Sequence, residues 1–318
     1  MTKPYLNLVE KALNYYNITV ESYDYLTEAT NIFYKVITKD QKKYVLKIFQ
    51  EESSSLQDNL AEQLLLTIIA DKTDLSVPEI VLAKDGRGIL QIAYAEEAVL
   101  KRVALYKWVA GEEYKGRESY DAFTKIGEIT AKLHKATLGA VIPPYIKPKK
   151  WDKVFYYQDE IAVYKQEKYS DIINDEYIQI MDRVIPILNT QLKKLYQNSK
   201  PQLIHGDINP WNIRIHNGEV FLLDFEEAML ALPIHDIAIH LFYYKYNTDL
   251  NYSFVKESFI KGYNKVLSLP KINEDIIEML MTARRVNFLN YILTVSDNPK
   301  EYIRVNIPRV KDFLQKYD

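Results

Sequence analysis

The residues best suited to chemistry gather in one β-rich stretch of the sequence, between Leu203 and Glu226. Asp207 and Asn212 lie five positions apart in a polar segment, and Asp224 follows the next apolar run. Transfer of a phosphoryl group needs a carboxylate that orients or deprotonates the attacking hydroxyl, and oxygen ligands that hold Mg²⁺ on the nucleotide phosphates. One acid and one amide in a loop, with a second acid after the following strand, would supply these groups.

Each of these residues also has an ordinary structural interpretation. A single Asp or Asn in a loop is usually a turn residue, and Lys47 considered alone would be an ordinary strand lysine. His205 is expected to support the loop backbone by hydrogen bonding, and Asp236 suits the N-cap of the helix that follows. The five histidines are too widely scattered to indicate a zinc site.

The elements that must position these residues begin with a small lobe over the first 110 residues, mostly antiparallel sheet with one main helix. Residues 31–37 and 43–49 are β-rich runs on either side of a polar connection, which indicates a β-hairpin. A helix is expected over residues 54–70, with an N-cap among residues 53–55. Its expected apolar stripe is Leu60, Leu64, Leu65 and Ile68. The other elements expected in this lobe are a helix at 4–16 and strands at 79–84, 88–94 and 99–109.

After Gly111 the periodicity becomes mainly helical, and the stretch from Leu203 to Glu226 is the one β-rich interruption. Pro186 and Pro308 are expected to kink or break their helices. The expected helices lie at 119–136, 172–197, 237–246, 252–267, 273–294 and 299–316.

Composition excludes several classes of protein. The 41 basic residues against 43 acidic ones argue against a protein built to bind nucleic acid. The absence of Cys removes disulfides, thiolate nucleophiles and Cys-ligated metal sites. The N-terminus lacks the apolar core of a signal peptide, and the most apolar stretch, residues 228–244, contains a proline, an aspartate and two histidines. We therefore expect a soluble, cytoplasmic protein without a membrane span.

The β-rich stretch carries a family resemblance. It has the spacing of a kinase catalytic loop, with Gly206 where protein kinases have Arg, and Asp224-Phe225-Glu226 where they have Asp-Phe-Gly. In this it resembles the aminoglycoside phosphotransferase superfamily, which also contains choline, homoserine, methylthioribose and fructosamine kinases, and within it the broad bacterial phosphotransferase-enzyme family. The resemblance spans about residues 20–245. Further matching segments, in order, are Asn31 to Tyr34, Val45 to Lys47, Glu62 to Leu65, Trp108 to Gly111, Gly127 to His134 and Pro233 to Asp236.

The resemblance implies an α+β, bilobal, protein-kinase-like fold. A small antiparallel β-lobe with one main helix, residues 1–107, would bind the nucleotide. Residues 108–112 would form a hinge, and residues 113–318 a larger, mainly helical lobe that carries catalysis and binds the acceptor.

The resemblance also implies roles for individual residues. Asp207 would be the catalytic base. Asn212 and Asp224 would bind Mg²⁺. Lys47 would contact the α- and β-phosphates of ATP, held by an ion pair with Glu62, although Glu28, Glu51 and Glu52 compete for the same lysine. The remaining nucleotide contacts are assigned to Asn31, Lys107 and Val109.

Two departures from protein kinases bear on these expectations. No Gly occurs before Gly86, so the phosphate-covering turn near residues 27–31 lacks the glycines of a protein kinase. Asp236 follows Asp224 by only twelve positions, which leaves no room for a long activation segment. The second departure favours a small-molecule acceptor over a folded protein.

The main hypothesis is therefore a phosphotransferase that uses ATP and Mg²⁺ and acts on a hydroxyl of a small polar molecule, such as an aminoglycoside-like antibiotic, an amino alcohol, a sugar or a homoserine-type metabolite. The alternatives are a serine/threonine protein kinase of the same superfamily and a non-catalytic, nucleotide-binding pseudokinase. Acidic and basic residues are mixed in the expected acceptor segments, near 150–180 and 270–295, so the acceptor stays open. Nucleic acid and membrane partners are not expected, and the chain would be a monomer or a homodimer.

Overall fold

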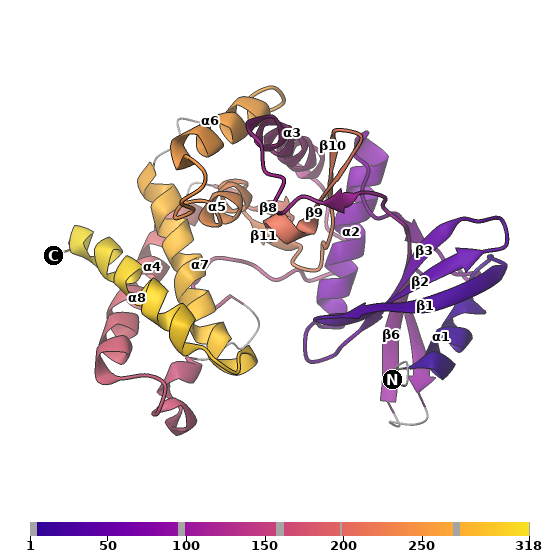
Figure 1. Cartoon of the computed structure of the whole chain (residues 1–318), viewed down its shortest axis with the longest axis horizontal. Coiled ribbons are helices and arrows are strands. Elements are labelled where there is room, and N and C mark those ends of the chain that lie inside the picture. Colours follow the sequence, from indigo (N-terminus) through magenta and orange to yellow (C-terminus); the bar gives the residue numbers. More distant parts are fainter. Residues whose placement is uncertain (1–4, 95–98, 157–161, 198, 270–273, 318) are drawn as a thin grey trace. The chain divides into compact units, whose positions relative to one another are not determined.

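The structure is a computed structural model that describes residues 5–94, 99–156, 162–197, 199–269 and 274–317 (Figure 1). It combines antiparallel sheets with helices, and the chain forms two compact units. The first unit comprises Met1–Glu118, Lys135–Pro148 and Trp211–Ala228, and the second comprises Ser119–His134, Lys149–Pro210 and Met229–Asp318. The hinge at residues 108–112 and the lobe boundaries beside it stay a prediction.

The first unit is built on an antiparallel sheet with strand order β1-β2-β3-β6-β4, in which β5 also pairs with β6. The predicted hairpin is confirmed, because β2 and β3 pair in register from Asn31 opposite Phe49 to Ile37 opposite Lys43. The strands are β1 (Val20–Glu28), β2 (Asn31–Thr38), β3 (Lys43–Phe49), β4 (Ile80–Val81), β5 (Leu90–Tyr94) and β6 (Val99–Lys107).

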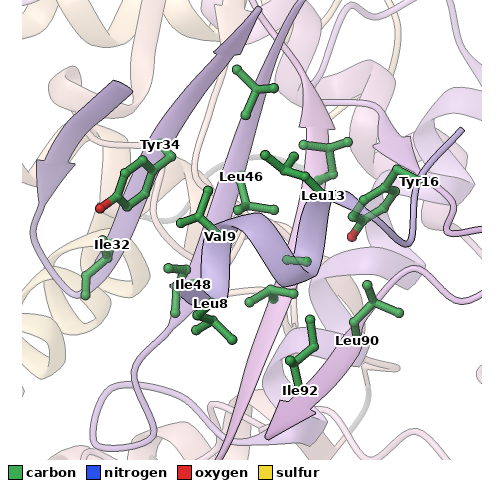
Figure 2. Close-up of a cluster of buried hydrophobic side chains, with 14 of the residues drawn as sticks. Leu8, Val9, Leu13, Tyr16, Ile32, Tyr34, Leu46, Ile48, Leu90 and Ile92 are labelled. Carbon is green, nitrogen blue, oxygen red and sulfur yellow. The ribbon is translucent and has the colours of Figure 1, made fainter. Parts of the chain in front are cut away.

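One face of this sheet carries the core of the unit. Helix α1 (Leu6–Leu13) lays Leu8 and Val9 on it, as Figure 2 shows. Side chains alternate between the two faces of a strand, so Tyr34 and Leu46 point into this core while their neighbours Phe33 and Lys47 line a pocket. The alternation along β3 thus directs the Lys47 amine toward the pocket, on the face of the strand opposite the apolar core.

Helix α2 (Leu56–Lys72) begins at an N-cap that the sequence predicts. The Ser55 side chain accepts a hydrogen bond from the Asp58 N–H, and the Asp58 carboxylate accepts one from the Ser55 N–H. The expected apolar stripe is only partly right, because Leu60 and Leu64 are half-buried. The buried face carries residues with helical spacing of three and four, namely Glu62, Leu65, Leu66 and Ile69. The helix therefore turns the Glu62 carboxylate inward, at a position that the expected stripe does not include.

A second, three-stranded sheet of the first unit positions the polar pair Asn212 and Asp224. Its order is β10-β9-β7, all antiparallel, with β7 (Glu112–Glu113), β9 (Ile213–His216) and β10 (Glu219–Leu222). The turn between β9 and β10 is Asn217-Gly218, both with positive φ (51° and 78°), as a tight hairpin requires. Asn212 lies just before this hairpin and Asp224 lies just after it. The Leu223 N–H donates to the Asn212 carbonyl at 2.8 Å, which keeps the two ends of the hairpin together.

The second unit is mainly helical. Strands β8 (Gln202–Ile204) and β11 (Met229–Ala231) pair antiparallel within it, and the loop after β8 carries Asp207. Pro186 and Pro308 do not break their helices: both lie inside continuous helices, whose buried faces hold them together despite the missing N–H, and the expected kinks stay a prediction. The helices are α3 (Tyr120–Thr137), α4 (Asp175–Gln197), α5 (Ile234–Phe242), α6 (Tyr252–Tyr263), α7 (Glu274–Val295) and α8 (Lys300–Leu314). Short 3₁₀ turns lie at Val163–Lys165, Glu167–Tyr169, Pro210–Asn212 and Gln315–Tyr317.

Helices α3 and α6 pack so closely that the backbone of each helix contacts the backbone of the other at Gly127 and Gly262. A Cβ atom on Gly127 would overlap the carbonyl oxygen of Phe259, and one on Gly262 would overlap that of Thr124. Beside this crossing, the ring of His134 on α3 contacts the hydroxyl of Tyr263 on α6, with 2.9 Å between Nδ1 and Oη. The two glycines therefore set the distance at which α3 lies from α6.

Candidate active site

The first unit contains a pocket of about 680 Å³. It opens between the free face of β2 and β3, helix α2 and the β9–β10 hairpin. Apolar side chains such as Leu26, Phe33, Val45 and Leu223 supply much of its wall. Of the eight predicted site residues, six line this pocket, namely Lys47, Glu62, Lys107, Val109, Asn212 and Asp224.

At the buried end of the pocket, Lys47 pairs with Glu62. The Lys47 Nζ lies 3.2 Å from Oε1 and 3.1 Å from Oε2 of Glu62, and both side chains are almost fully buried. Tyr106 donates from its hydroxyl to Glu62 Oε1 at 3.2 Å. This carboxylate is held by two donors, which fixes the direction in which the lysine extends.

A second carboxylate, that of Glu226, also reaches Lys47. Its Oε2 lies 3.4 Å from the Lys47 Nζ and also accepts a hydrogen bond from Asn31 Nδ2. Its Oε1 accepts a hydrogen bond from the Thr30 hydroxyl at 2.8 Å. Asn31 in turn accepts from the Gln50 N–H at 3.1 Å. Side chains rather than glycines thus hold the turn before β2, and Asn31 lies beside the pocket as an anchor of that turn.

The sequence analysis assigns Glu226 no role. The only available signal is its place as the third residue of Asp224-Phe225-Glu226, where protein kinases have glycine. A carboxylate at that position is a large chemical change, and the contact with Lys47 is its structural result.

Three carboxylates surround the Lys47 ammonium and shift its pKa. Burial alone would disfavour its charge, but the carboxylates of Glu62, Glu226 and Asp224 outweigh burial and raise the pKa of Lys47 above its ordinary value. Burial raises the pKa of Glu62, Lys47 opposes this rise, and Glu226 adds to it. One ammonium among three carboxylates leaves this end of the pocket with a surplus of negative charge, which suits a divalent cation.

Asn212 and Asp224 fit the requirements of Mg²⁺ on a nucleotide. Mg²⁺ is usually held by one or two protein oxygens together with phosphates and water, rather than by a cage of side chains. Among the described residues, no group of three or more His, Cys, Asp or Glu could hold a metal ion. The backbone of Asp224 has φ of 57°, in the left-handed region that non-glycine residues seldom adopt outside functional or turn positions.

Asp207 lies in the second unit, in the loop after β8. Its Oδ2 accepts from Asn209 Nδ2 at 2.6 Å and its Oδ1 accepts from a guanidinium nitrogen of Arg284 at 2.5 Å. The Asp207 N–H donates to His205 Nδ1 at 3.2 Å, so the expected backbone support from His205 is confirmed. The contact with Arg284 on α7 was not predicted from the sequence, in which Arg284 is one of the charged residues of the segment near 270–295.

The side chain of Asp236 binds the backbone of the same loop. The expectation that it is an N-cap is wrong, because α5 begins at Ile234 with Pro233 at the cap position, and Asp236 lies within the first turn of the helix. Its carboxylate accepts from the backbone N–H groups of His205 (3.0 Å) and Gly206 (2.8 Å), and contacts His134 Nε2 at 3.0 Å. Burial opposes its charge, but the interactions with His134, His205 and the Gly206 N–H together outweigh burial and lower the pKa of Asp236. A buried, ionised acid thus fixes the backbone on the N-terminal side of Asp207.

Gly206 explains one difference from protein kinases. Its φ of 82° lies in the left-handed region, and its N–H points to the Asp236 carboxylate. A side chain at this position would strain the turn. The glycine therefore belongs to the backbone geometry of the loop.

The acceptor side of the site is only partly described. Asp159 and Glu160, two acidic residues of the expected acceptor segment near 150–180, lie outside the described residues. In the same regions, the acidic Glu176 forms an ion pair with Lys311, and the basic Arg284 forms one with Asp207. Among the described helices, none combines the length and the apolar composition needed to span a membrane.

Comparison with known proteins places the chain in a family. Residues 27–264 match the model of the phosphotransferase enzyme family, whereas no curated protein matches the sequence. Amicoumacin kinase hAmiN in complex with AMP-PNP, Ca²⁺ and Ami is a similar structure, with 19% identity, a TM-score of 0.79 and coverage of 98% of this chain and 94% of that one. A microcompartment-associated aminopropanol kinase has 18% identity, a TM-score of 0.73 and coverage of 96% and 94%.

Choline kinase LicA from Streptococcus pneumoniae is more distant, with 15% identity, a TM-score of 0.56 and coverage of 98% and 99%. At these identities the three likenesses establish the fold, which is α+β and protein-kinase-like. The family match covers about three quarters of the sequence and includes every predicted site residue. The chain therefore belongs to the phosphotransferase enzyme family and is a phosphotransferase of the small-molecule kinase type.

Proposed function

We propose that this protein transfers the γ-phosphate of ATP to a hydroxyl group of a small polar molecule, in a reaction that depends on Mg²⁺. The observation that carries the proposal is the pocket of the first unit, in which the Lys47–Glu62 pair, Asp224 and Asn212 converge. Apolar walls suit a purine, and the charged end suits a metal–phosphate group.

The proposed nucleotide contacts follow from the pocket lining. Lys47 would donate to the α- and β-phosphates, held in place by Glu62. At the other end, the backbone N–H of Lys107 already donates to the Glu79 carbonyl at 2.8 Å. We therefore assign the Lys107 carbonyl and the Val109 N–H to the adenine edge. Asn31 would act indirectly, by holding the turn over the phosphates through Glu226.

Asn212 and Asp224 would hold the Mg²⁺ ion. When bound, Mg²⁺ supplies neutralisation of the charge on the β- and γ-phosphates. The surplus of negative charge around Lys47 supports this assignment, because Glu62, Glu226 and Asp224 together exceed the charge of one ammonium.

Asp207 would act on the acceptor. A carboxylate held by Asn209 and Arg284 still has lone pairs that accept a hydrogen bond from a hydroxyl and then its proton. Residues five positions apart in a chain cannot have Cα atoms more than about 18 Å apart, so connectivity alone keeps Asp207 near the metal ligand Asn212. Such catalysis consists of positioning and charge stabilisation.

The first test is nucleotide binding and phosphoryl transfer by the purified protein. ATP with Mg²⁺ and radiolabelled γ-phosphate is supplied with aminoglycosides, choline, aminopropanol, homoserine and sugars in turn. The proposal expects ATP binding and a labelled product with at least one small hydroxyl compound. A protein that binds no ATP and labels nothing in the panel contradicts it.

Two further outcomes separate the alternatives. Labelling of the protein itself or of proteins in a lysate, without a small-molecule product, identifies a protein kinase. Stabilisation by ATP against thermal unfolding, without turnover, identifies a pseudokinase, since saturating ligand adds about 2–3 kcal/mol to the free energy of unfolding. The expected monomer or homodimer and the expected cytoplasmic location stay predictions.

A further inference from the structure

Arg284 is buried against the proposed catalytic acid. It projects from α7, is 6% exposed, and donates to Asp207 Oδ1 at 2.5 Å and to the Tyr243 hydroxyl at 3.2 Å. Its guanidinium carbon also lies 4.7 Å from the ring centroid of Phe288. All these residues belong to the second unit.

The Asp207 carboxylate is held at both oxygens. Asn209, two positions along the same loop, donates to Oδ2, whereas Arg284 reaches Oδ1 from a helix that is distant in sequence. Asp236 of α5 holds the backbone of this loop, whereas the contact with Asn209, which lies in the loop itself, does not link the carboxylate directly to a helix. Arg284 ties it to α7.

Burying the Arg284 guanidinium costs desolvation free energy, so its ion pair with Asp207 need not stabilise the fold. The Arg284 Nε is buried and has no hydrogen-bond partner among the described residues. Burial disfavours its charge, while Tyr243 and Asp207 restore it and raise the pKa of Arg284. Buried ion pairs are commonly replaced by apolar side chains of similar volume without loss of stability. Stability alone is therefore a weak explanation for an arginine buried at this position, whereas contact with the proposed catalytic acid gives it a role.

We propose that Arg284 is a positioning residue that fixes the Asp207 carboxylate for the acceptor hydroxyl, an assignment that rests on the function proposed above. Arg284 occupies one lone pair of Oδ1, so the remaining lone pairs of the carboxylate keep a fixed direction toward the hydroxyl. Displacement of a reacting group by about 1 Å can cost about 100-fold in rate.

The experiment compares two neighbouring buried arginines of α7. Arg284→Met removes the contact with Asp207, and Arg284→Lys keeps the charge without the planar guanidinium. Arg285→Lys is the matched control, because Arg285 is 1% exposed, donates to Asn306 Oδ1 at 3.1 Å and has no contact with Asp207 among the described interactions. For each folded variant, ATP affinity is measured by calorimetry, and turnover by phosphate release with water as the acceptor.

We expect turnover to fall about 100-fold in Arg284→Met and about 10-fold in Arg284→Lys, with ATP affinity and the KM for ATP unchanged within about twofold. Arg285→Lys should keep the turnover of the unmodified protein. Because Arg284 acts through Asp207, the double variant Asp207→Asn/Arg284→Met should be no slower than Asp207→Asn alone.

Several results overturn the proposal. One is turnover in Arg284→Met within about threefold of the unmodified protein, and another is a multiplicative loss in the double variant. A third is a similar loss in Arg284→Lys and Arg285→Lys, which would show that both arginines serve only the packing of α7. Failure of the unmodified protein to bind ATP overturns the proposed function together with this inference. Normal turnover with an unimpaired Arg284→Met variant overturns this inference alone.

Discussion

The Nζ atom of Lys47 lies 3.4 Å from Oε2 of Glu226, so the buried lysine is shared between two carboxylates rather than paired with one. Glu226 connects this ammonium to Thr30 and Asn31 in the turn before β2. The consequence is that the turn without glycine, the lysine and the segment that carries Asp224 form a single hydrogen-bonded group within the first unit.

Replacement of Glu226 by Gln should weaken the use of Mg²⁺. The change removes one of the three negative charges near Lys47, and residues that support a metal site typically change metal affinity by about 10- to 100-fold. We expect the Mg²⁺ concentration for half-maximal turnover to rise by that factor, measured at saturating ATP. Glu227→Gln makes the same change in net charge at the adjacent position and serves as the control. An equal effect in both variants would assign the change to net charge and not to the contact of Glu226.

Replacement of Asp224 by Asn tests the metal assignment without disturbing the backbone. Asn tolerates the left-handed φ of 57°, whereas Ala would add strain of about 1–2 kcal/mol. We expect affinity for ATP with Mg²⁺ to fall at least about tenfold. Affinity for ATP without Mg²⁺ should not fall, because a negative charge has been removed from the pocket. Calorimetry with and without EDTA measures both, and a loss of equal size in each condition would contradict the assignment.

Replacement of Asp207 by Asn should separate chemistry from nucleotide binding. The amide keeps the shape of the side chain but loses the charge and the proton acceptor, so kcat should fall by roughly 10²–10⁴-fold. ATP affinity should stay within about twofold, since the pocket lies in the first unit. Steady-state kinetics and calorimetry on the same preparation measure the two quantities. Loss of ATP binding in this variant would reverse the roles of Asp207 and Asp224.

Two buried histidines should make the fold sensitive to mild acid. Burial lowers the pKa of His235 and of His240 to about 4, whereas the unfolded chain titrates near 6.5. As the pH falls from 6.5 toward 4, the unfolded state binds protons that the folded state does not bind, so stability is lost. Linkage gives a loss of about 2 kcal/mol for each histidine at pH 5.

The contribution of one histidine can be isolated by substitution. His240 contacts the Ile208 carbonyl through Nδ1 at 3.1 Å, and His240→Gln retains a possible donor without a titrating ring. Urea unfolding at pH 7.5 and pH 5.0 should show a difference that is smaller by about 2 kcal/mol in the variant. An unchanged difference would mean that His240 does not titrate in this range.

The strands and the pocket-facing lysine could be predicted because their signals are local. Alternation along β2 and β3 fixes which side chains share a face, and the Asn217-Gly218 turn fixes the register that brings Asn212 and Asp224 together. The inward carboxylate on α2 could not be read from hydrophobic periodicity, because Glu62 occupies a buried position that periodicity assigns to an apolar residue. What makes that position tolerable is Lys47, which lies on another element.

The partners of the acidic residues were the least predictable part of the site. Asp207 with Arg284, and Glu226 with Lys47, are pairs whose members lie far apart in sequence, and no local pattern records such a pairing. Asp236 is a similar case, since a position near a helix start suggests a cap, while tertiary packing gives its carboxylate to the loop of Asp207. The motifs identify which residues to examine, whereas the folded chain decides what each one contacts.

The crossing of α3 and α6 closes one common route to a more heat-resistant protein. Replacing a helical glycine by alanine ordinarily stabilises a protein by about 0.4–1 kcal/mol, because the unfolded chain loses conformational freedom. At Gly127 and Gly262 the added methyl group would meet a carbonyl oxygen of the opposite helix, so the entropic gain is lost to steric overlap. Moving α3 away would also draw His134 from Asp236, and with it the support of the Asp207 loop. Adaptation of this chain to higher temperature must therefore begin elsewhere in the molecule.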